Sequence, residues 1–200
     1  MNYAAHNKEL HNTLLYTEEP VVFTKADSAL LSGGKPFFIP SYTNQCEYET
    51  ELVVRISHLG RSISERFAHR YYDEITVGID FTARDLQREA IAKGLPWEMC
   101  KGFDHSAALS PEFVPLAELG GDVQNLEFEM ELNGEVRQRG FTKDMLFTVD
   151  EIISHISRYM TLRIGDLIYT GTPVGVGAVK AGDNIKARIG GHTLLDFDVM

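Results

Sequence analysis

The sequence predicts a mixed α+β fold in which short strands outnumber helices. Short runs of β-branched and aromatic residues recur along the 200-residue chain, and most of them are bounded by Gly, Pro or Asn-Gly turn signals. Amphipathic helical patterns are few, and they do not alternate regularly with strands as they would in a doubly wound parallel sheet. We therefore expect a strand-rich α+β domain with a few peripheral helices.

The composition excludes several classes of protein. The chain is 44% apolar and 24% charged, as in ordinary globular domains. Its net charge is −10 and its basic residues form no run, which argues against nucleic acid or an anionic membrane as partner. No apolar stretch suits a membrane span and no signal-peptide pattern opens the chain. Cys46 and Cys100 match no disulfide framework or zinc spacing, so we expect a cytoplasmic protein.

The first expected element is a helix over residues 4–15. His6 and Glu9 lie three positions apart and share a face of that helix. A carboxylate can stabilise the imidazolium that forms when a histidine takes a proton from water. The alternative is a solvated helix with incidental polar neighbours. Asn2 looks like the end of a preceding strand, so we expect an N-terminal strand to be missing from this chain.

Residues 46–56 predict a strand with carboxylates on one face. Because side chains alternate along a strand, Glu47, Glu49 and Glu51 should point to the same side. Carboxylates so close together repel one another unless water or a cation separates them. The face is therefore either a hydrated surface or a site for a hard cation such as Mg²⁺ or Ca²⁺.

A strand-to-helix corner follows in the segment ITVGIDFTARDLQ. Asp80 ends the expected strand, Thr82 is the expected N-cap, and Asp85 lies near the capping-box position. Arg84 and Gln87 share a face of the expected helix. The corner can present a carboxylate, a guanidinium and an amide in one direction, or it can hold an Asp–Arg pair across an ordinary turn.

Lys101 follows that helix, whose expected end is Gly94. It lies in an expected loop between Trp97 and Phe103. There it can be a surface lysine with its stem on the aromatic rings, or a partly desolvated cation that faces the site.

Three regular elements are expected in the second half of the chain. Residues 126–132 alternate strictly and lead through an Asn-Gly type I′ turn at residues 133–134 into a return strand. An amphipathic helix is expected over residues 148–159. A final hairpin should turn at residues 190–191.

A glycine-rich loop over residues 171–177 follows a short apolar strand. Such a loop exposes backbone N–H groups, and together with the Thr172 hydroxyl it can cradle a substrate carboxylate. Alternatively, its glycines only meet the dihedral demands of a tight turn.

Together these segments resemble the fumarylacetoacetate hydrolase family in its short, single-domain form. The resemblance covers nearly the whole chain and rests on segments in the right order and spacing. They are NYAAHNKEL, YETEL, DFTARDLQ, the W-x-x-x-K-x-F-D run from residue 97, NGEVRQRGFTKDM and LIYTGTPVGVG. It implies one catalytic domain over residues 1–200, folded as a mixed β-sandwich or β-roll and forming a homodimer.

The resemblance also implies a site at one end of the sandwich. Glu49, Glu51 and Asp80 correspond to the family's ligands for Mg²⁺ or a similar divalent ion, Mn²⁺ or Ca²⁺, while Glu47 lies outside the family pattern. Thr172 corresponds to the residue that contacts the substrate carboxylate. The other implied catalytic and substrate-binding residues are His6, Glu9, Arg84, Gln87 and Lys101.

The implied activity is hydrolysis of a carbon–carbon bond in a 1,3-diketo acid of the acylpyruvate or fumarylacetoacetate type, through a metal-stabilised enolate. His6, helped by Glu9, would deprotonate the attacking water. The same centre also fits decarboxylation of oxaloacetate, and isomerisation or decarboxylation of 2-oxo-dienoates from aromatic catabolism. A third alternative is a relative that binds metal and ligand without turnover. The expected partner is a small 2-oxo acid, with no nucleic acid and no membrane.

Overall fold

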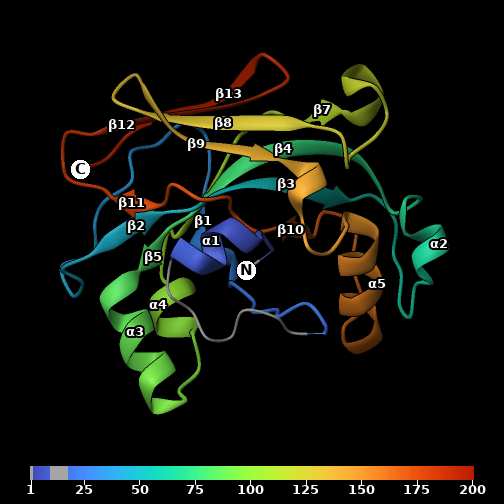
Figure 1. The fold of residues 1–200 in the computed structure, drawn as a ribbon, viewed down its shortest axis with the longest axis horizontal. Helices are drawn as coiled ribbons and strands as arrows, with labels where there is room; N and C mark the ends of the chain where they lie inside the picture. The colour runs from blue at the N-terminus through green and yellow to red at the C-terminus, as the bar shows by residue number, and fades with distance from the viewer. Residues whose placement is uncertain (1, 10–17) are drawn as a thin grey trace.

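The computed structural model describes residues 2–9 and 18–200, and it confirms the predicted strand-rich α+β class (Figure 1). Among those residues the largest sheet has six strands. Its order is β1 (Leu30–Leu31), β6 (Ala107–Leu109), β4 (Tyr72–Asp80), β3 (Thr50–Ile56) and β10 (Leu167–Tyr169), and β7 (Val114–Pro115) also pairs with β4. The long strands β3 and β4 pair antiparallel and form the middle of this sheet.

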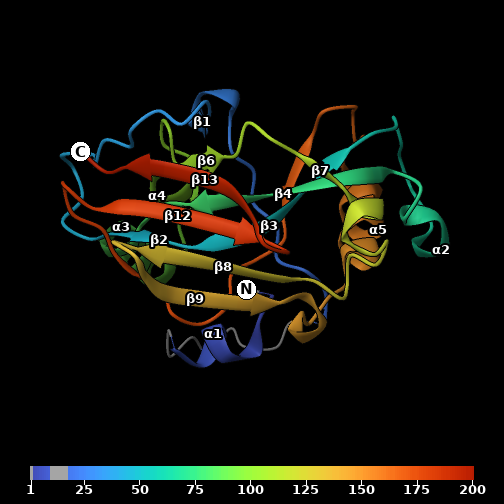
Figure 2. The ribbon, with the colours of Figure 1, turned by 90° about the horizontal axis from the view of Figure 1, so that it is seen from above.

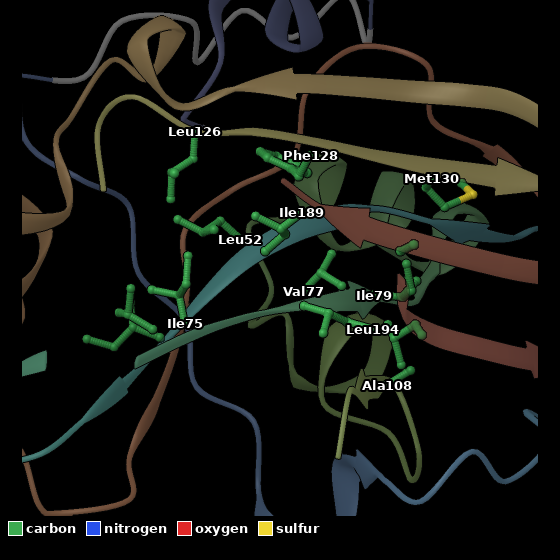
Figure 3. Packing of buried hydrophobic residues seen from close by; sticks show 14 of the residues in the cluster. Leu52, Ile75, Val77, Ile79, Ala108, Leu126, Phe128, Met130, Ile189 and Leu194 are labelled. Carbon is green, nitrogen blue, oxygen red and sulfur yellow. The ribbon is translucent and has the colours of Figure 1, made fainter. Parts of the chain in front are cut away.

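A second, antiparallel sheet packs over the first (Figure 2). Its order is β13 (His192–Asp198), β12 (Asn184–Ile189), β8 (Glu127–Leu132) and β9 (Glu135–Phe141). Figure 3 shows the core between the two sheets, where inward side chains of both sheets meet. Burial of each large apolar side chain stabilises the fold by roughly 1.5–3 kcal/mol. The labelled core residues include Leu52, Val77, Ile79, Phe128, Met130 and Ile189.

Both predicted hairpins are confirmed. β8 turns into β9 at Asn133 and Gly134, whose φ angles of 54° and 80° are those that a type I′ turn requires. β12 turns into β13 at Gly190 and Gly191, which also have positive φ.

A small third sheet contains β11 (Gly177–Ala178), β2 (Cys46–Tyr48) and β5 (Thr82–Ala83). The single strand predicted over residues 46–56 is therefore wrong. The chain leaves this small sheet after Tyr48 and enters the large sheet at Thr50, because β2 pairs with β5 and β11 whereas β3 pairs with β4 and β10. Glu49 lies at the break between the two sheets.

The helices lie around the sheets, with α5 at one end and α3 and α4 at the other (Figure 1). None of the described helices is long and apolar enough to cross a membrane. The predicted amphipathic helix is confirmed as α5, and Thr148 and Glu151 form a reciprocal capping box at its start. The helices are α1 (Ala4–Glu9), α2 (Glu65–Ala68), α3 (Arg84–Lys93), α4 (Glu98–Lys101) and α5 (Val149–Tyr159), and the 3₁₀ turns are η1 (Asp27–Ala29), η2 (Leu116–Leu119) and η3 (Thr142–Asp144).

Three predictions around α3 and α4 are wrong. Thr82 is not the N-cap, because it belongs to β5 and the helix begins one residue after Ala83. Asp85 forms no capping box and instead accepts hydrogen bonds from the side chain of Thr43 and the backbone of Asn44. Lys101 lies at the end of α4 rather than in a loop. The predicted end of α3 at Gly94 is confirmed by its left-handed φ of 63°.

The N-terminal segment is anchored beside the glycine-rich loop. Asn2 donates from Nδ2 to the carbonyl oxygens of Phe147 and Thr170, each over 2.9 Å, and its Oδ1 accepts from the Phe147 N–H over 2.7 Å. The predicted helix over residues 4–15 is observed as α1 up to Glu9, and the remainder of that prediction lies outside the described residues.

Candidate metal and substrate site

Three carboxylates converge where the chain passes between the sheets. One oxygen each from Glu49, Glu51 and Asp80 lies within 4.8 Å of the other two, and their exposed fractions are 5%, 5% and 2%. Glu51 pairs with Gly78, and because side chains alternate, Asp80 two residues later points to the same face of the sheet. We name these residues the acidic cluster. The structure therefore brings together the residues predicted as metal ligands.

Two lysines lie against the acidic cluster. Lys101 Nζ donates to Glu49 Oε2 and Asp80 Oδ2, each over 2.7 Å, and to Thr82 Oγ1 over 2.6 Å. Its side chain is buried, so the alternative of a surface lysine is wrong. Although burial opposes it, Asp80 and Glu49 hold the pKa of Lys101 above its ordinary value. The second lysine is Lys25, whose Nζ lies 2.6 Å from Asp80 Oδ1.

Arg84 clamps the strand that carries the acidic residues. Its Nε donates to Glu47 Oε2 over 2.6 Å, and its two terminal nitrogens donate to Glu49 Oε1 and Gln87 Oε1, each over 2.5 Å. The predicted shared face of Arg84 and Gln87 is therefore observed. Glu47 is buried on this side of the site too, but it binds the guanidinium and is not one of the clustered carboxylates.

Positive charge is distributed unevenly over the acidic cluster. Burial raises the pKa of Glu49, but the nearby charges of Lys101 and Arg84 outweigh it and hold this pKa below its ordinary value. Burial, together with the charges of Asp80 and Glu49, raises the pKa of Glu51 to about 8. Both oxygens of Asp80 face ammonium groups, Oδ1 that of Lys25 and Oδ2 that of Lys101, whereas Glu51 forms no ion pair among the described residues. A buried carboxylate without a cationic partner fits a site for a divalent cation such as Mg²⁺, Mn²⁺ or Ca²⁺.

The predicted dyad is formed at the end of α1. His6 Nδ1 lies 3.3 Å from Glu9 Oε2, and the two Glu9 oxygens accept from the Gly175 N–H over 3.1 and 3.2 Å. His6 is 2% exposed, so the interpretation of a solvated histidine is wrong. Burial lowers the pKa of His6, although Glu49 and Glu9 act in the opposite direction. The imidazole is therefore mainly neutral at pH 7 and can accept a proton.

Two N–H groups of the glycine-rich loop bind acidic side chains of the protein itself. The Gly171 N–H donates to Glu51 Oε2 over 2.6 Å, and the Gly175 N–H donates to Glu9. Thr172 is buried, and its Oγ1 accepts from Gln138 Nε2 over 2.8 Å. These two N–H groups are therefore occupied by acidic side chains of the protein, and the binding of a substrate carboxylate by Thr172 stays a prediction.

A cavity of about 610 Å³ opens beside the acidic cluster. Glu51, Asp80 and Lys25 are among the residues that line it. Residues 20–27 also line the cavity, together with residues of α5, β10 and several connecting segments. The volume is within the usual range for small-molecule sites.

Lys25, Gln138 and Asn2 are site residues that the sequence analysis missed. Lys25 ends the apolar run VVFTK, but a lysine at such a position is usually solvated, so the signal is weak. Gln138 accepts from the Thr50 N–H over 2.9 Å and so connects β9 to the strand of the acidic cluster. These contacts join distant parts of the chain, and no local sequence pattern predicts them.

The chain is similar to known proteins over its whole length. A family model described as fumarylacetoacetate (FAA) hydrolase C-terminal matches residues 1–200. The chain is 44% identical over 198 residues to the mitochondrial oxaloacetate tautomerase of Arabidopsis thaliana. This match covers 99% of this chain and 87% of that protein. It is 39% identical over 193 residues to the oxaloacetate tautomerase of Escherichia coli strain K12. This match covers 96% of this chain and 87% of that protein.

Solved structures share the whole fold. The fumarylpyruvate hydrolase of Pseudomonas aeruginosa in complex with Mn²⁺ and pyruvate superposes with a TM-score of 0.91 at 35% identity, covering 100% of this chain and 86% of that one. The 2-hydroxyhepta-2,4-diene-1,7-dioate isomerase of Mycobacterium marinum superposes with a TM-score of 0.85 at 32% identity, covering 100% and 71%.

Proposed function

The chain belongs to the fumarylacetoacetate hydrolase family, and on that premise we propose that it is a divalent-metal-dependent hydrolase of 1,3-diketo acids. The substrate is of the acylpyruvate or fumarylacetoacetate type. The products are a free acid and an oxo acid, which is pyruvate when the substrate is an acylpyruvate. The observation that carries this proposal is the buried, mainly neutral His6 with its Glu9 partner, because hydrolysis needs a base to activate water.

Glu49, Glu51 and Asp80 would hold the cation, with Mg²⁺ as the first choice and Mn²⁺ or Ca²⁺ as alternatives. When bound, the cation supplies Lewis-acid polarisation of the substrate oxygens. The neighbouring fumarylpyruvate hydrolase structure contains Mn²⁺ and pyruvate. This supports a divalent ion and a 2-oxo acid as the ligands of the site.

Arg84, Gln87 and Lys101 would donate hydrogen bonds where negative charge develops on the substrate. A well-placed donor of this kind is worth roughly 3 kcal/mol in the transition state. All of them already contact the acidic cluster or its neighbours, so they also hold the carboxylates in position. The Thr172 hydroxyl would bind the substrate carboxylate, and Gln138 holds that hydroxyl in place.

His6 would take a proton from water while Glu9 stabilises the resulting imidazolium. The hydroxide adds to the distal carbonyl carbon, and the bond between that carbon and the neighbouring CH₂ carbon breaks. Its electron pair stays with the pyruvate fragment as an enolate, which a proton from His6 converts to the 2-oxo acid. The distal carbonyl becomes the carboxylic acid.

Loss of the ultraviolet absorbance of an acylpyruvate enol, measured with Mg²⁺ and after chelation, tests this proposal. We expect Mg²⁺-dependent loss with equal amounts of pyruvate and free acid. Loss of absorbance without a free acid would contradict hydrolysis.

The second candidate acts on oxaloacetate without attack by water. It is favoured by the relatives named oxaloacetate tautomerases, at 39–44% identity. Oxaloacetate decarboxylation and the isomerisation or decarboxylation of 2-oxo-dienoates use the same enolate chemistry. A His6→Ala variant that keeps full turnover of its substrate would favour this group, because none of these reactions needs an activated water. If the His6→Ala variant instead loses the turnover of acylpyruvate that the wild type shows, the result favours hydrolysis.

We also propose that the protein is a homodimer, as the family resemblance implies, and that it acts in the cytoplasm. Light scattering of the purified protein tests the first statement and fractionation of the source cells tests the second. The mitochondrial names of some relatives make the second test necessary. A third alternative, a relative that binds metal and ligand without turnover, would show metal binding and no reaction with any of these substrates.

A further inference from the structure

Gln138 is a buried polar residue at an inward position of β9. Its side chain is 1% exposed, and its cross-strand partner Met130 is apolar, as inward residues of a sheet usually are. A buried amide that lacked hydrogen-bond partners would destabilise the fold. The contacts of Gln138 satisfy its amide and connect β9 with β3 and with the glycine-rich loop.

The partners of Gln138 determine which way its amide points. Its Oε1 accepts from the Thr50 N–H over 2.9 Å, and this backbone group can only donate. Its Nε2 donates to the Pro173 carbonyl oxygen over 2.9 Å, and this oxygen can only accept. The reversed amide would set donor against donor at Thr50 and acceptor against acceptor at Pro173. Only the observed orientation therefore satisfies both neighbours.

This orientation determines how the Thr172 hydroxyl can act. Nε2 of Gln138 also donates to Thr172 Oγ1 over 2.8 Å, so the hydroxyl oxygen is the acceptor in this contact. Within residues 2–9 and 18–200, the hydroxyl donates to no group of the protein. A hydroxyl carries one donor besides its acceptor lone pairs, and its proton is therefore left for a ligand. A carboxylate suits that proton, because its oxygens only accept.

The glycine-rich loop lies directly against this amide. A Cβ at Gly175 would come within 3.3 Å of Gln138 Cγ and would overlap the Arg137 carbonyl oxygen. Gly175 also has a φ of 105°, which L side chains rarely adopt. Close packing of the loop on β9 thus supports the contact between Gln138 and Thr172.

We propose that Gln138 is a positioning residue for the substrate carboxylate. Because its amide donates to the Thr172 hydroxyl oxygen, the hydroxyl proton is kept for donation to that carboxylate. The contact with Thr50, which lies between Glu49 and Glu51 in the sequence, ties the amide to the acidic cluster. This inference rests on the proposed function, which places the substrate carboxylate at Thr172.

Gln138→Met tests the inference, because Met has a similar length and no N–H donor. Calorimetry measures the binding of pyruvate in saturating Mn²⁺, without any turnover. The affinity for pyruvate should fall about tenfold, which corresponds to ~1.4 kcal/mol. Wild-type affinity in this variant, or no binding of pyruvate by the wild type, would overturn the inference.

A double-mutant cycle separates positioning from a general structural effect. Thr172→Val removes the hydroxyl at nearly constant volume and should weaken pyruvate binding by a similar factor. Since Gln138 acts through this hydroxyl, the double variant should bind pyruvate no more weakly than Thr172→Val alone. A further tenfold loss in the double variant would show that Gln138 acts elsewhere, and it would contradict the inference.

Gln124→Met is the matched control. Gln124 also connects two backbone groups, because it donates to the Thr142 carbonyl oxygen over 3.0 Å and accepts from the Val149 N–H over 2.8 Å. Neither group belongs to the glycine-rich loop. The control should lose stability in urea denaturation, as Gln138→Met does, but bind pyruvate as the wild type does. An equal loss of pyruvate affinity in both variants would argue against positioning.

Gln138→Glu replaces Gln138→Met if the latter does not fold. The new carboxylate can still accept from the Thr50 N–H, but it also accepts the proton of the Thr172 hydroxyl. Pyruvate affinity should again fall at least tenfold, and retained affinity would overturn the inference.

The two proposals can fail separately. If pyruvate binding follows this pattern but no acylpyruvate is hydrolysed, the positioning role stands and the proposed reaction fails. If acylpyruvate is hydrolysed but Thr172→Val binds pyruvate normally, the reaction stands and the role of Gln138 fails.

Discussion

Glu49 and Glu51 have different surroundings although they lie two residues apart. Glu49 receives hydrogen bonds from Arg84 and Lys101. Glu51 receives the backbone N–H of Gly171. Burial costs a carboxylate its hydration, and only Glu49 regains full charge stabilisation from neighbours. At the scale of single residues, the site is therefore arranged to bind additional positive charge beside Glu51.

Asp80→Asn tests the acidic cluster at this scale. We expect turnover that depends on Mg²⁺ to fall by about 100-fold or more, since even indirect changes around a metal cost 10–100-fold. Equilibrium binding of Mn²⁺, followed by calorimetry, should weaken in parallel. Asp73→Asn is the control, because Asp73 is exposed on the same strand β4. Full activity of Asp80→Asn would contradict the assignment of the metal site.

At the scale of elements, α5 supports the end of the large sheet and one wall of the cavity. Its capping box satisfies two backbone N–H groups, because Thr148 accepts from Glu151 N over 3.1 Å and Glu151 accepts from Thr148 N over 2.6 Å. The buried side chains of Ile152 and Ile153 then attach the helix to the core. The cap and the packing act on the same element and support each other.

Thr148→Ala should lower the free energy of unfolding by about 1 kcal/mol, the usual value of an N-cap hydrogen bond. Urea denaturation measures the effect. Ser64→Ala is the matched control, because Ser64 is at the N-cap of α2 and its side chain makes no capping hydrogen bond. An equal loss of unfolding free energy in both variants would show that the capping box does not contribute to stability.

Asp85 joins α3 to the segment before β2, and this contact predicts a dependence of stability on pH. Burial raises the pKa of Asp85, but hydrogen bonds from Thr43, Asn44 and Leu86 outweigh burial and lower this pKa below its ordinary value. A carboxyl group with a depressed pKa stabilises the fold above its ordinary pKa of 3.8, and that contribution is lost as the pH falls through the folded-state value.

Urea denaturation of the wild type and of Asp85→Asn, from pH 7 down to pH 3, measures this contribution. The variant should be less stable at pH 7, and the difference should shrink at the acid end of the series. A difference that is constant with pH would mean that the ionisation of Asp85 plays no part.

At the scale of the whole molecule, the site depends on contacts between the N-terminal segment and the glycine-rich loop over residues 171–177. Gly171 has a φ of 104°, and a Cβ there would lie 2.6 Å from the Cβ of Asn2. The same glycine donates its N–H to Glu51. One loop position therefore connects the N-terminal segment that carries His6 with the acidic cluster.

Gly171→Ala should displace Asn2 and with it His6, so that hydrolysis falls at least tenfold in addition to a loss of stability of roughly 1–2 kcal/mol from the left-handed backbone. Gly182→Ala is the matched control, because Gly182 has a φ of 94° with no atom within 4 Å of an added Cβ. It should lose similar stability and keep its activity. Unchanged kcat/KM in Gly171→Ala would contradict the proposed role of this contact.

Local patterns in the sequence were sufficient for the hairpins, for α5 and for the shared face of Arg84 and Gln87. Each of these depends on dihedral preferences or on side-chain periodicity within a few residues. The predicted N-cap at Thr82 was wrong because a contact between distant segments decides the structure there. Pairing between β5 and β2 overrode the local preference of that residue, and this pairing is a contact between distant segments.

The sequence by itself determined the residue types of the site, because carboxylates, a histidine dyad and a lysine occur in motifs with diagnostic spacing. Only the tertiary structure decided their chemical states. The approach of Lys25 to Asp80, the raised pKa of Glu51 and the neutral His6 all follow from burial and from neighbours far away in the chain. Electrostatic interactions depend on distance in space and on desolvation, and neither quantity can be read from residue order.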